Sequence, residues 1–235
     1  IYSDVKYLGI DQCKDCHFDI YRKFINTGMG KSFNYAKKEY SASILDTTLY
    51  DEKLGVTYTP YWYNDSLIIS EYHHQQKIKK LDTIDYIIGS GHHTNSHIIN
   101  HNGYLFQAPF TYYTQDSILD FPPGFESGNN SRFEREIGLE CMTCHNAYPH
   151  FIEGSTNKYN QIPTGIDCER CHGPGELHVK NIQAGNLVDT SIYFDYTILN
   201  PSSLSIELQN EICSRCHIQG NSVLKYDKSF FDFRP

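Results

Sequence analysis

Four short stretches of the sequence share one pattern: Cys13-Lys14-Asp15-Cys16-His17, Cys141-Met142-Thr143-Cys144-His145, Cys168-Glu169-Arg170-Cys171-His172 and Cys213-Ser214-Arg215-Cys216-His217. These Cys-x-x-Cys-His motifs contain all eight cysteines of the 235-residue chain. Histidine makes up only 12 of the 235 residues, so a histidine directly after each of four pairs is not a chance arrangement. Each motif therefore supplies two thiols and one imidazole to a common purpose.

Covalent attachment of haem c explains the whole motif, whereas other uses of cysteine explain only part of it. A disulfide framework does not need four identically spaced pairs, and zinc sites built from Cys-x-x-Cys knuckles leave the histidines without a role. A thioredoxin-like redox motif occurs once, beside a βαβ pattern. In Cys-x-x-Cys-His, two thiols on a short helical turn form thioethers with one porphyrin, and the adjacent histidine ligates the iron. We expect four haem c groups, with the proximal iron ligands His17, His145, His172 and His217.

Composition excludes two other classes of protein. Hydrophobic residues make up 39% of the chain, and no apolar run approaches the roughly 18 residues that span a bilayer. The formal net charge is −8 and no cluster of basic residues stands out, so nucleic-acid binding is not expected. The apolar residues are too few for an ordinary large core, a deficit that four apolar macrocycles would fill.

The motifs are spread unevenly, which predicts an α+β fold of low secondary-structure content in a single tetrahaem unit. Residues 1–46 carry the first motif and residues 126–235 carry the other three, in short helices and loops around haem. Residues 47–125 contain no motif and form a small antiparallel β-rich insertion. Within it, Tyr58–Tyr63 and Leu67–Tyr72 flank Asn64-Asp65, and His97–His101 and Tyr104–Phe106 flank Asn102-Gly103; each set predicts a hairpin. The segments around 15–26 and 133–144 are expected to be helical.

A six-coordinate haem needs a second axial ligand, usually His or Met. His150 and His178 follow proximal histidines closely, which disfavours reaching the far face of their own haem, so as ligands they are expected to serve neighbouring haems. A hydrogen bond to a propionate or to the backbone is the alternative for each. In Gly89-Ser90-Gly91-His92-His93 the glycines permit close approach to a planar group, and one of the two histidines is expected to be a ligand. Met29, between two glycines, is a candidate thioether ligand; a gap-filling core methionine is the alternative.

These residues resemble those of a known family. Cys168–His178, with Gly173-Pro174-Gly175 between two histidines, resembles a motif of the multihaem cytochromes c related to the tetrahaem electron acceptor of hydroxylamine oxidoreductase. The resemblance implies that His178 is a distal ligand to another haem. Ile87–His93, the run Gly103–Pro109 and Thr27–Met29 are similar to a bacterial subfamily, which implies His93 rather than His92 and supports Met29; Asn146–His150 also fits. Some members of that subfamily continue into tetratricopeptide repeats, so the resemblance leaves open whether the natural chain continues past Pro235. His97 and His101 lie outside this pattern.

Electron transfer along closely packed haems is the leading interpretation, and it makes the protein an electron carrier rather than an enzyme. One alternative is an oxidoreductase with an open haem acting on nitrite- or hydroxylamine-type substrates, in which His73, His74, His97 and His101 supply acid–base groups. Another is a subunit of an extracellular cytochrome filament.

The location and partners follow from haem attachment and charge. The machineries that attach haem c work outside the cytoplasmic membrane, so we expect a periplasmic or extracellular protein whose export signal is absent from this chain. An acidic surface predicts redox partner proteins with a basic docking patch.

Overall fold

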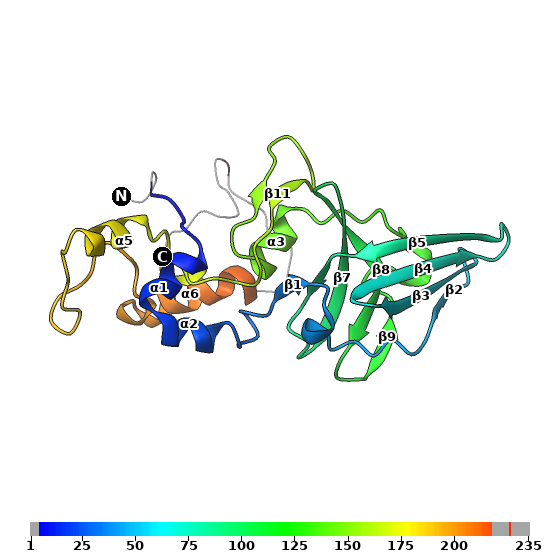
Figure 1. Cartoon of the computed structure of the whole chain (residues 1–235), viewed down its shortest axis with the longest axis horizontal. Coiled ribbons are helices and arrows are strands. Elements are labelled where there is room, and N and C mark those ends of the chain that lie inside the picture. Colours follow the sequence, from blue (N-terminus) through cyan, green and yellow to red (C-terminus); the bar gives the residue numbers. More distant parts are fainter. Residues whose placement is uncertain (1–4, 218–225, 227–235) are drawn as a thin grey trace.

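The computed structural model describes residues 5–217 and residue 226, and it separates the helices from the main sheets (Figure 1). The helices are α1 (Ile10–Cys16), α2 (Phe18–Phe24), α3 (Leu139–His145), α4 (Glu169–His172), α5 (Glu176–Gln183) and α6 (Ile206–His217). Single 3-10 turns span Lys38–Tyr40, Glu126–Gly128 and Pro201–Ser203. Within the described residues, no helix is both long enough and apolar enough to cross a membrane.

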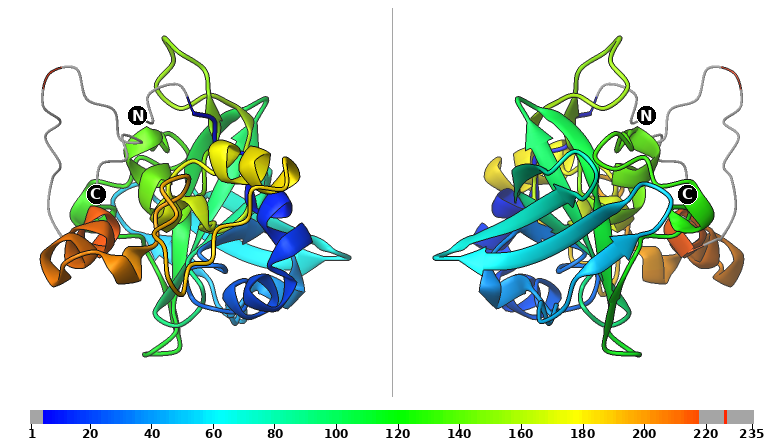
Figure 2. Two further views of the ribbon diagram at one scale, coloured as in Figure 1. Left: turned by 90° about the vertical axis from the view of Figure 1, so that its left-hand side faces the viewer. Right: turned by 90° about the vertical axis from the view of Figure 1, so that its right-hand side faces the viewer.

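The strands form three antiparallel sheets. One sheet has the order β1-β6-β7-β8-β9, the second β2-β3-β4-β5 and the third pairs β10 with β11. The strands are β1 (Phe33–Tyr35), β2 (Leu49–Asp51), β3 (Val56–Tyr63), β4 (Ser66–His73), β5 (Ile78–Ile84), β6 (Tyr86–Ile88), β7 (Thr94–His101), β8 (Tyr104–Tyr113), β9 (Ile118–Asp120), β10 (His150–Phe151) and β11 (Tyr159–Gln161). Figure 2 shows the two ends of the molecule, with helices facing the viewer in one view and the main sheets in the other. The expected α+β class, with antiparallel sheets and short helices, is confirmed.

Both predicted hairpins are present. Strands β3 and β4 pair with Tyr63 opposite Ser66, and Asn64 in the turn between them has a φ of 53°. Strands β7 and β8 pair with His101 opposite Tyr104. There Asn102 and Gly103 have φ values of 55° and 92°, and positive φ at both central residues is the backbone that Asn-Gly favours in a two-residue turn.

The helix expected over 133–144 was wrong in its first half, because α3 begins only at Leu139. The preceding residues run beside β8 instead. The Ile137 amide donates to the Leu105 carbonyl at 3.0 Å, and the Gln107 amide donates to the Arg135 carbonyl at 2.9 Å. Backbone groups used in this pairing are not available for helical hydrogen bonds. The helical segment expected around 15–26 is present, but it starts at Ile10 and is divided at His17 into α1 and α2.

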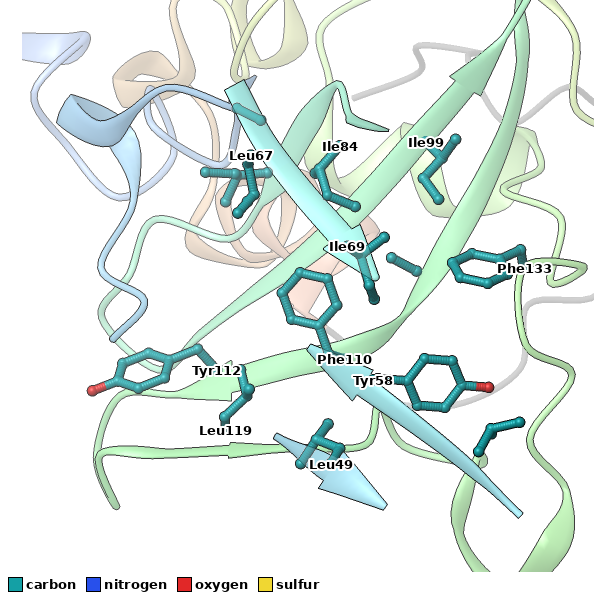
Figure 3. Packing of buried hydrophobic residues seen from close by; sticks show 14 residues of the cluster. Leu49, Tyr58, Leu67, Ile69, Ile84, Ile99, Phe110, Tyr112, Leu119 and Phe133 are labelled. Carbon is teal, nitrogen blue, oxygen red and sulfur yellow. The ribbon is translucent and has the colours of Figure 1, made fainter. Parts of the chain in front are cut away.

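The hydrocarbon core is concentrated in the sheets. Figure 3 shows Tyr58 and Ile69 of the four-stranded sheet close to Phe110 of the five-stranded sheet, and all three are fully buried. A smaller cluster around Phe33, Leu105 and Met142 links the sheets to α3. By contrast, α1, α2 and α5 bury none of their side chains. The hydrocarbon core therefore fills the space between the sheets and reaches α3, but it does not extend to α1, α2 or α5.

The β7–β8 turn provides a test of this fold. Gly103 has a φ of 92°, and a Cβ atom added there would lie 2.7 Å from the Tyr159 carbonyl oxygen. Gly154 has a similar φ of 81° but nothing within 4 Å, so it is a matched control. We expect Gly154→Ala to cost about 1–2 kcal/mol from backbone strain alone, and Gly103→Ala to cost more because β11 must also move. Urea unfolding of the haem-loaded protein measures both; equal costs would show that the contact with Tyr159 is not important.

Candidate haem-binding site

Each Cys-x-x-Cys-His motif lies on a helix, as the spacing predicts. The first motif lies in α1, the second in α3, the third begins at the start of α4 and the fourth closes α6. Helical spacing puts cysteines three positions apart on one face of the helix, with the histidine one residue further on. All eight cysteines are free thiols, and each is partly or fully exposed. The structure therefore presents four equivalent pairs of thiols without any disulfide between them.

The first motif lies against the third. The thiols of Cys13 and Cys168 are hydrogen-bonded to each other, which raises the pKa of Cys13 and lowers the pKa of Cys168. Two motifs that are far apart in the sequence meet through their first cysteines.

The second motif lies against the fourth, and here the second cysteines of the two motifs, Cys144 and Cys216, meet. A hydrogen bond from Cys216 lowers the pKa of Cys144 to about 6 and raises the pKa of Cys216. Each thiol also contacts the other motif's backbone: Cys144 Sγ lies 3.8 Å from the Arg215 carbonyl oxygen, and Cys216 Sγ lies 3.8 Å from the Thr143 carbonyl oxygen.

Arg170 connects the two pairs of motifs. It lies within the third motif and is buried, and its guanidinium donates to the Thr143 carbonyl of the second motif. The same guanidinium is close enough to act electrostatically on the thiols of Cys144 and Cys216. All four attachment sites therefore belong to one contiguous region.

Two of the histidines predicted to be ligands lie close together. The rings of His17 and His178 are 6.4 Å apart between centroids, and their planes differ by 19°. The contact pairs His178 with the proximal histidine of the first motif, not with that of its own segment.

Hydrogen bonds orient two of the imidazoles that the sequence predicts as ligands. His178 Nδ1 lies 3.1 Å from Asp195 Oδ2, and His172 Nδ1 lies 2.8 Å from the Leu199 carbonyl oxygen. Metal-bound histidines commonly use one ring nitrogen in this way, which leaves the other for the metal. Asp195 and Leu199 were missed by sequence reasoning, because both lie in an irregular segment without a motif.

Met29, His93 and His150 are not brought against a proximal histidine by any ring contact in the described part of the chain. The Met29 side chain is 44% exposed, and the Met29 carbonyl accepts from the Ile166 amide at 3.0 Å. Nearby, Ser32 Oγ donates to the His145 carbonyl at 2.8 Å, so the Met29 loop lies beside the second and third motifs. His93 is exposed, with Nδ1 3.0 Å from Gln115 Nε2, and His150 is exposed at the start of β10.

The remaining histidines are on the sheets or their turns. His97 is fully buried and stacks on Phe110, with ring centroids 4.0 Å apart. His74 Nε2 lies 2.7 Å from Thr57 Oγ1, and His101 Nε2 lies 3.2 Å from Asp82 Oδ1. His73 Nδ1 accepts from the Gln76 amide at 3.3 Å. These four histidines have local roles in the β-rich region.

The donor set fits covalently attached haem. Within the described residues, no group of three or more His, Cys, Asp or Glu side chains is arranged to hold a metal ion, although all eight cysteines are described. Haem iron needs only two protein ligands, and the neighbouring His17 and His178 would be able to provide two. Apolar side chains of α2, which directly follows the first motif, are exposed, with Phe18 at 56% and Ile20 at 64%, and they suit contact with an apolar macrocycle.

Comparison with known proteins agrees with this chemistry over part of the chain. Residues 125–173, which include the second and third motifs, match the family described as cytochrome c554 and c-prime. This match supports covalently bound haem c in a cytochrome-like segment. A solved undecahaem cytochrome from the S-layer of Carboxydothermus ferrireducens aligns with 19% identity and a TM-score of 0.46 over 91% of this chain. The chain spans only 25% of that protein's length. No curated protein sequence matches the chain.

His97 predicts a pH effect on stability. Burial lowers the pKa of His97 from 6.5 to about 3. Between these pH values His97 is therefore protonated in the unfolded chain but neutral in the folded chain. This contribution to stability is complete above pH 6.5 and declines as the pH falls toward 3. Between pH 7 and pH 5 we expect wild type to lose about 2 kcal/mol more than His97→Gln. Urea unfolding at both pH values measures the difference. Identical losses in the two proteins, or an altered haem spectrum in the variant, would contradict a purely structural His97.

Proposed function

We propose that this protein is a tetrahaem c-type cytochrome that transfers electrons in the periplasm or at the cell surface. The main support is that four Cys-x-x-Cys-His motifs, dispersed along the chain, meet in two pairs: Cys13 with Cys168 and Cys144 with Cys216. Electron transfer between haems requires attachment points that lie close together. Four haems that worked independently would not need their attachment points to meet. When bound, haem c supplies one-electron oxidation and reduction at iron.

In this proposal the chain's own residues attach the haems, bind the iron atoms and orient the ligand side chains. The eight cysteines form the thioethers, and His17, His145, His172 and His217 bind the iron atoms as proximal ligands. We assign His178 as the distal ligand partnered with His17, on the strength of their 6.4 Å ring separation. Met29, His93 and His150 are the proposed distal ligands of the other three haems. Since His178 takes the place opposite His17, Met29 serves another haem, and its loop lies beside the second and third motifs.

Contacts between the motifs set the order of the proposed electron route. The first motif contacts the third and the fourth contacts the second, while Arg170 joins the third motif to the second and fourth. We therefore propose that the first motif lies at one end of the route. With a formal net charge of −8, the protein is expected to bind redox partners through a basic patch on the partner, and this binding should weaken as salt is added.

A haem count and low-temperature EPR test the proposed function together. We expect a pyridine haemochrome assay to give four haems per chain, and the oxidised protein to give only low-spin signals, because every iron has two protein ligands. Any other count would overturn the tetrahaem assignment. A stoichiometric high-spin signal that responds to nitrite or hydroxylamine would favour an enzyme with an open haem instead. Particles seen as regular filaments by electron microscopy would favour a filament subunit.

Replacing His178 tests the ligand assignment. In His178→Ala we expect four haems to remain attached and one of the four to become high-spin, because His17 loses its partner across the iron. EPR of the oxidised variant measures the high-spin fraction. The matched control is His74→Ala, which removes a histidine bonded to Thr57 on the sheet and should leave every haem low-spin. A fully low-spin His178→Ala protein would refute the assignment.

A further inference from the structure

Glu169 is a buried carboxylate in the third motif, where the Cys-x-x-Cys-His pattern places no demand on residue type. It occupies the first variable position, between Cys168 and Arg170, and only 1% of the residue is exposed. Among the described residues, no lysine, arginine or histidine nitrogen forms an ion pair with it. A buried carboxylate is costly unless its oxygens accept hydrogen bonds, so Glu169 requires an explanation.

Backbone amides from two distant segments satisfy this carboxylate. The Leu8 amide lies 3.0 Å from Oε1 and 2.9 Å from Oε2, and the Gly9 amide donates to Oε2 at 2.7 Å. On the other side, the Gly175 amide donates to Oε1 at 2.7 Å. Leu8 and Glu169 are 161 positions apart in the sequence. One side chain therefore joins the start of the chain to the third motif.

The two glycines are the residues that precede two helices. Gly9 is the N-cap residue of α1, which carries Cys13 and ends directly before His17. Gly175 is the N-cap residue of α5, which carries His178. Thus Glu169 binds the starting points of both helices that position the His17–His178 pair. Glu176, in the first turn of α5, adds a weaker contact of the same kind, because its Oε2 accepts from the Lys6 amide at 2.9 Å on the surface.

We propose that Glu169 is a positioning residue for the first haem: its carboxylate fixes α1 and α5 relative to each other and thereby sets the separation of His17 and His178. This inference rests on the proposed function. The carboxylate also places a negative charge at the junction of the first and third motifs. A buried negative charge stabilises the more positive, oxidised iron, so Glu169 lowers the reduction potential of the haems attached there.

The test is Glu169→Gln, which keeps the shape of the side chain but replaces an acceptor oxygen with an NH2 group facing backbone amides. We expect a more positive potential for at least one haem in a spectroelectrochemical titration, and a new high-spin or altered low-spin signal in EPR. The matched control is Glu176→Gln, which should leave the potentials and EPR signals close to those of wild type. A merely structural role for Glu169 would lower the unfolding midpoint without moving the potential of the folded protein.

Hydrogen exchange of the wild-type holoprotein provides a second measurement that does not depend on the variant folding. We expect the Leu8, Gly9 and Gly175 amides to be protected to a similar degree, and exchange at the rate of free amides would overturn the proposal. Unchanged potentials and EPR signals in a four-haem Glu169→Gln protein would also overturn it, while leaving the proposed function intact. A wild-type chain that carries no haem would instead refute the proposed function.

Discussion

The arrangement of the four motifs depends on backbone contacts between the segment that follows the first motif and the segment that precedes the third. The first of these segments is Met29–Phe33, and the second contains Gly165 and Ile166. The Gly165 amide donates to the Phe33 carbonyl at 2.7 Å, and the Ile166 amide donates to the Met29 carbonyl at 3.0 Å. A Cβ atom at Gly165 would lie 2.2 Å from the Gly30 carbonyl oxygen, so this approach requires glycine. These contacts, with those of Glu169, bring the first motif onto the third.

The β-rich region between the first and second motifs has a hydrocarbon core of its own. Its two main sheets share this core, and its buried carboxylates accept hydrogen bonds. Glu71 accepts from Arg132 Nε at 2.8 Å, and Asn130 donates to Asp51 Oδ2 at 2.9 Å. The region therefore does not need haem to bury its side chains. Helices α1, α2 and α5 bury none of theirs and depend on other contacts.

Local signals in the sequence predicted the parts of the structure that local chemistry determines. The Asn102-Gly103 turn is fixed by two residues that tolerate positive φ, and the motif helices are fixed by the spacing of their cysteines. The helix expected from Phe133 failed because Glu136 and Ile137 pair with β8, a partner that no local pattern reveals. In addition, one strand of the five-stranded sheet, Phe33–Tyr35, comes from the segment assigned to the first haem.

The same distinction applies to the ligands. Spacing alone disfavours His178 as the second ligand of the haem bound by His172, six residues earlier, but it does not say which haem His178 serves. That choice depends on two contacts that no sequence pattern predicts. Glu169 holds the start of α5, and Asp195 orients the His178 ring. It follows that the order of motifs along the chain is not the order of contact. The first motif meets the third and the second meets the fourth, so the proposed electron route crosses the sequence order. A substitution in one motif should therefore perturb the haem of the motif it contacts more strongly than the haem of the next motif in the sequence.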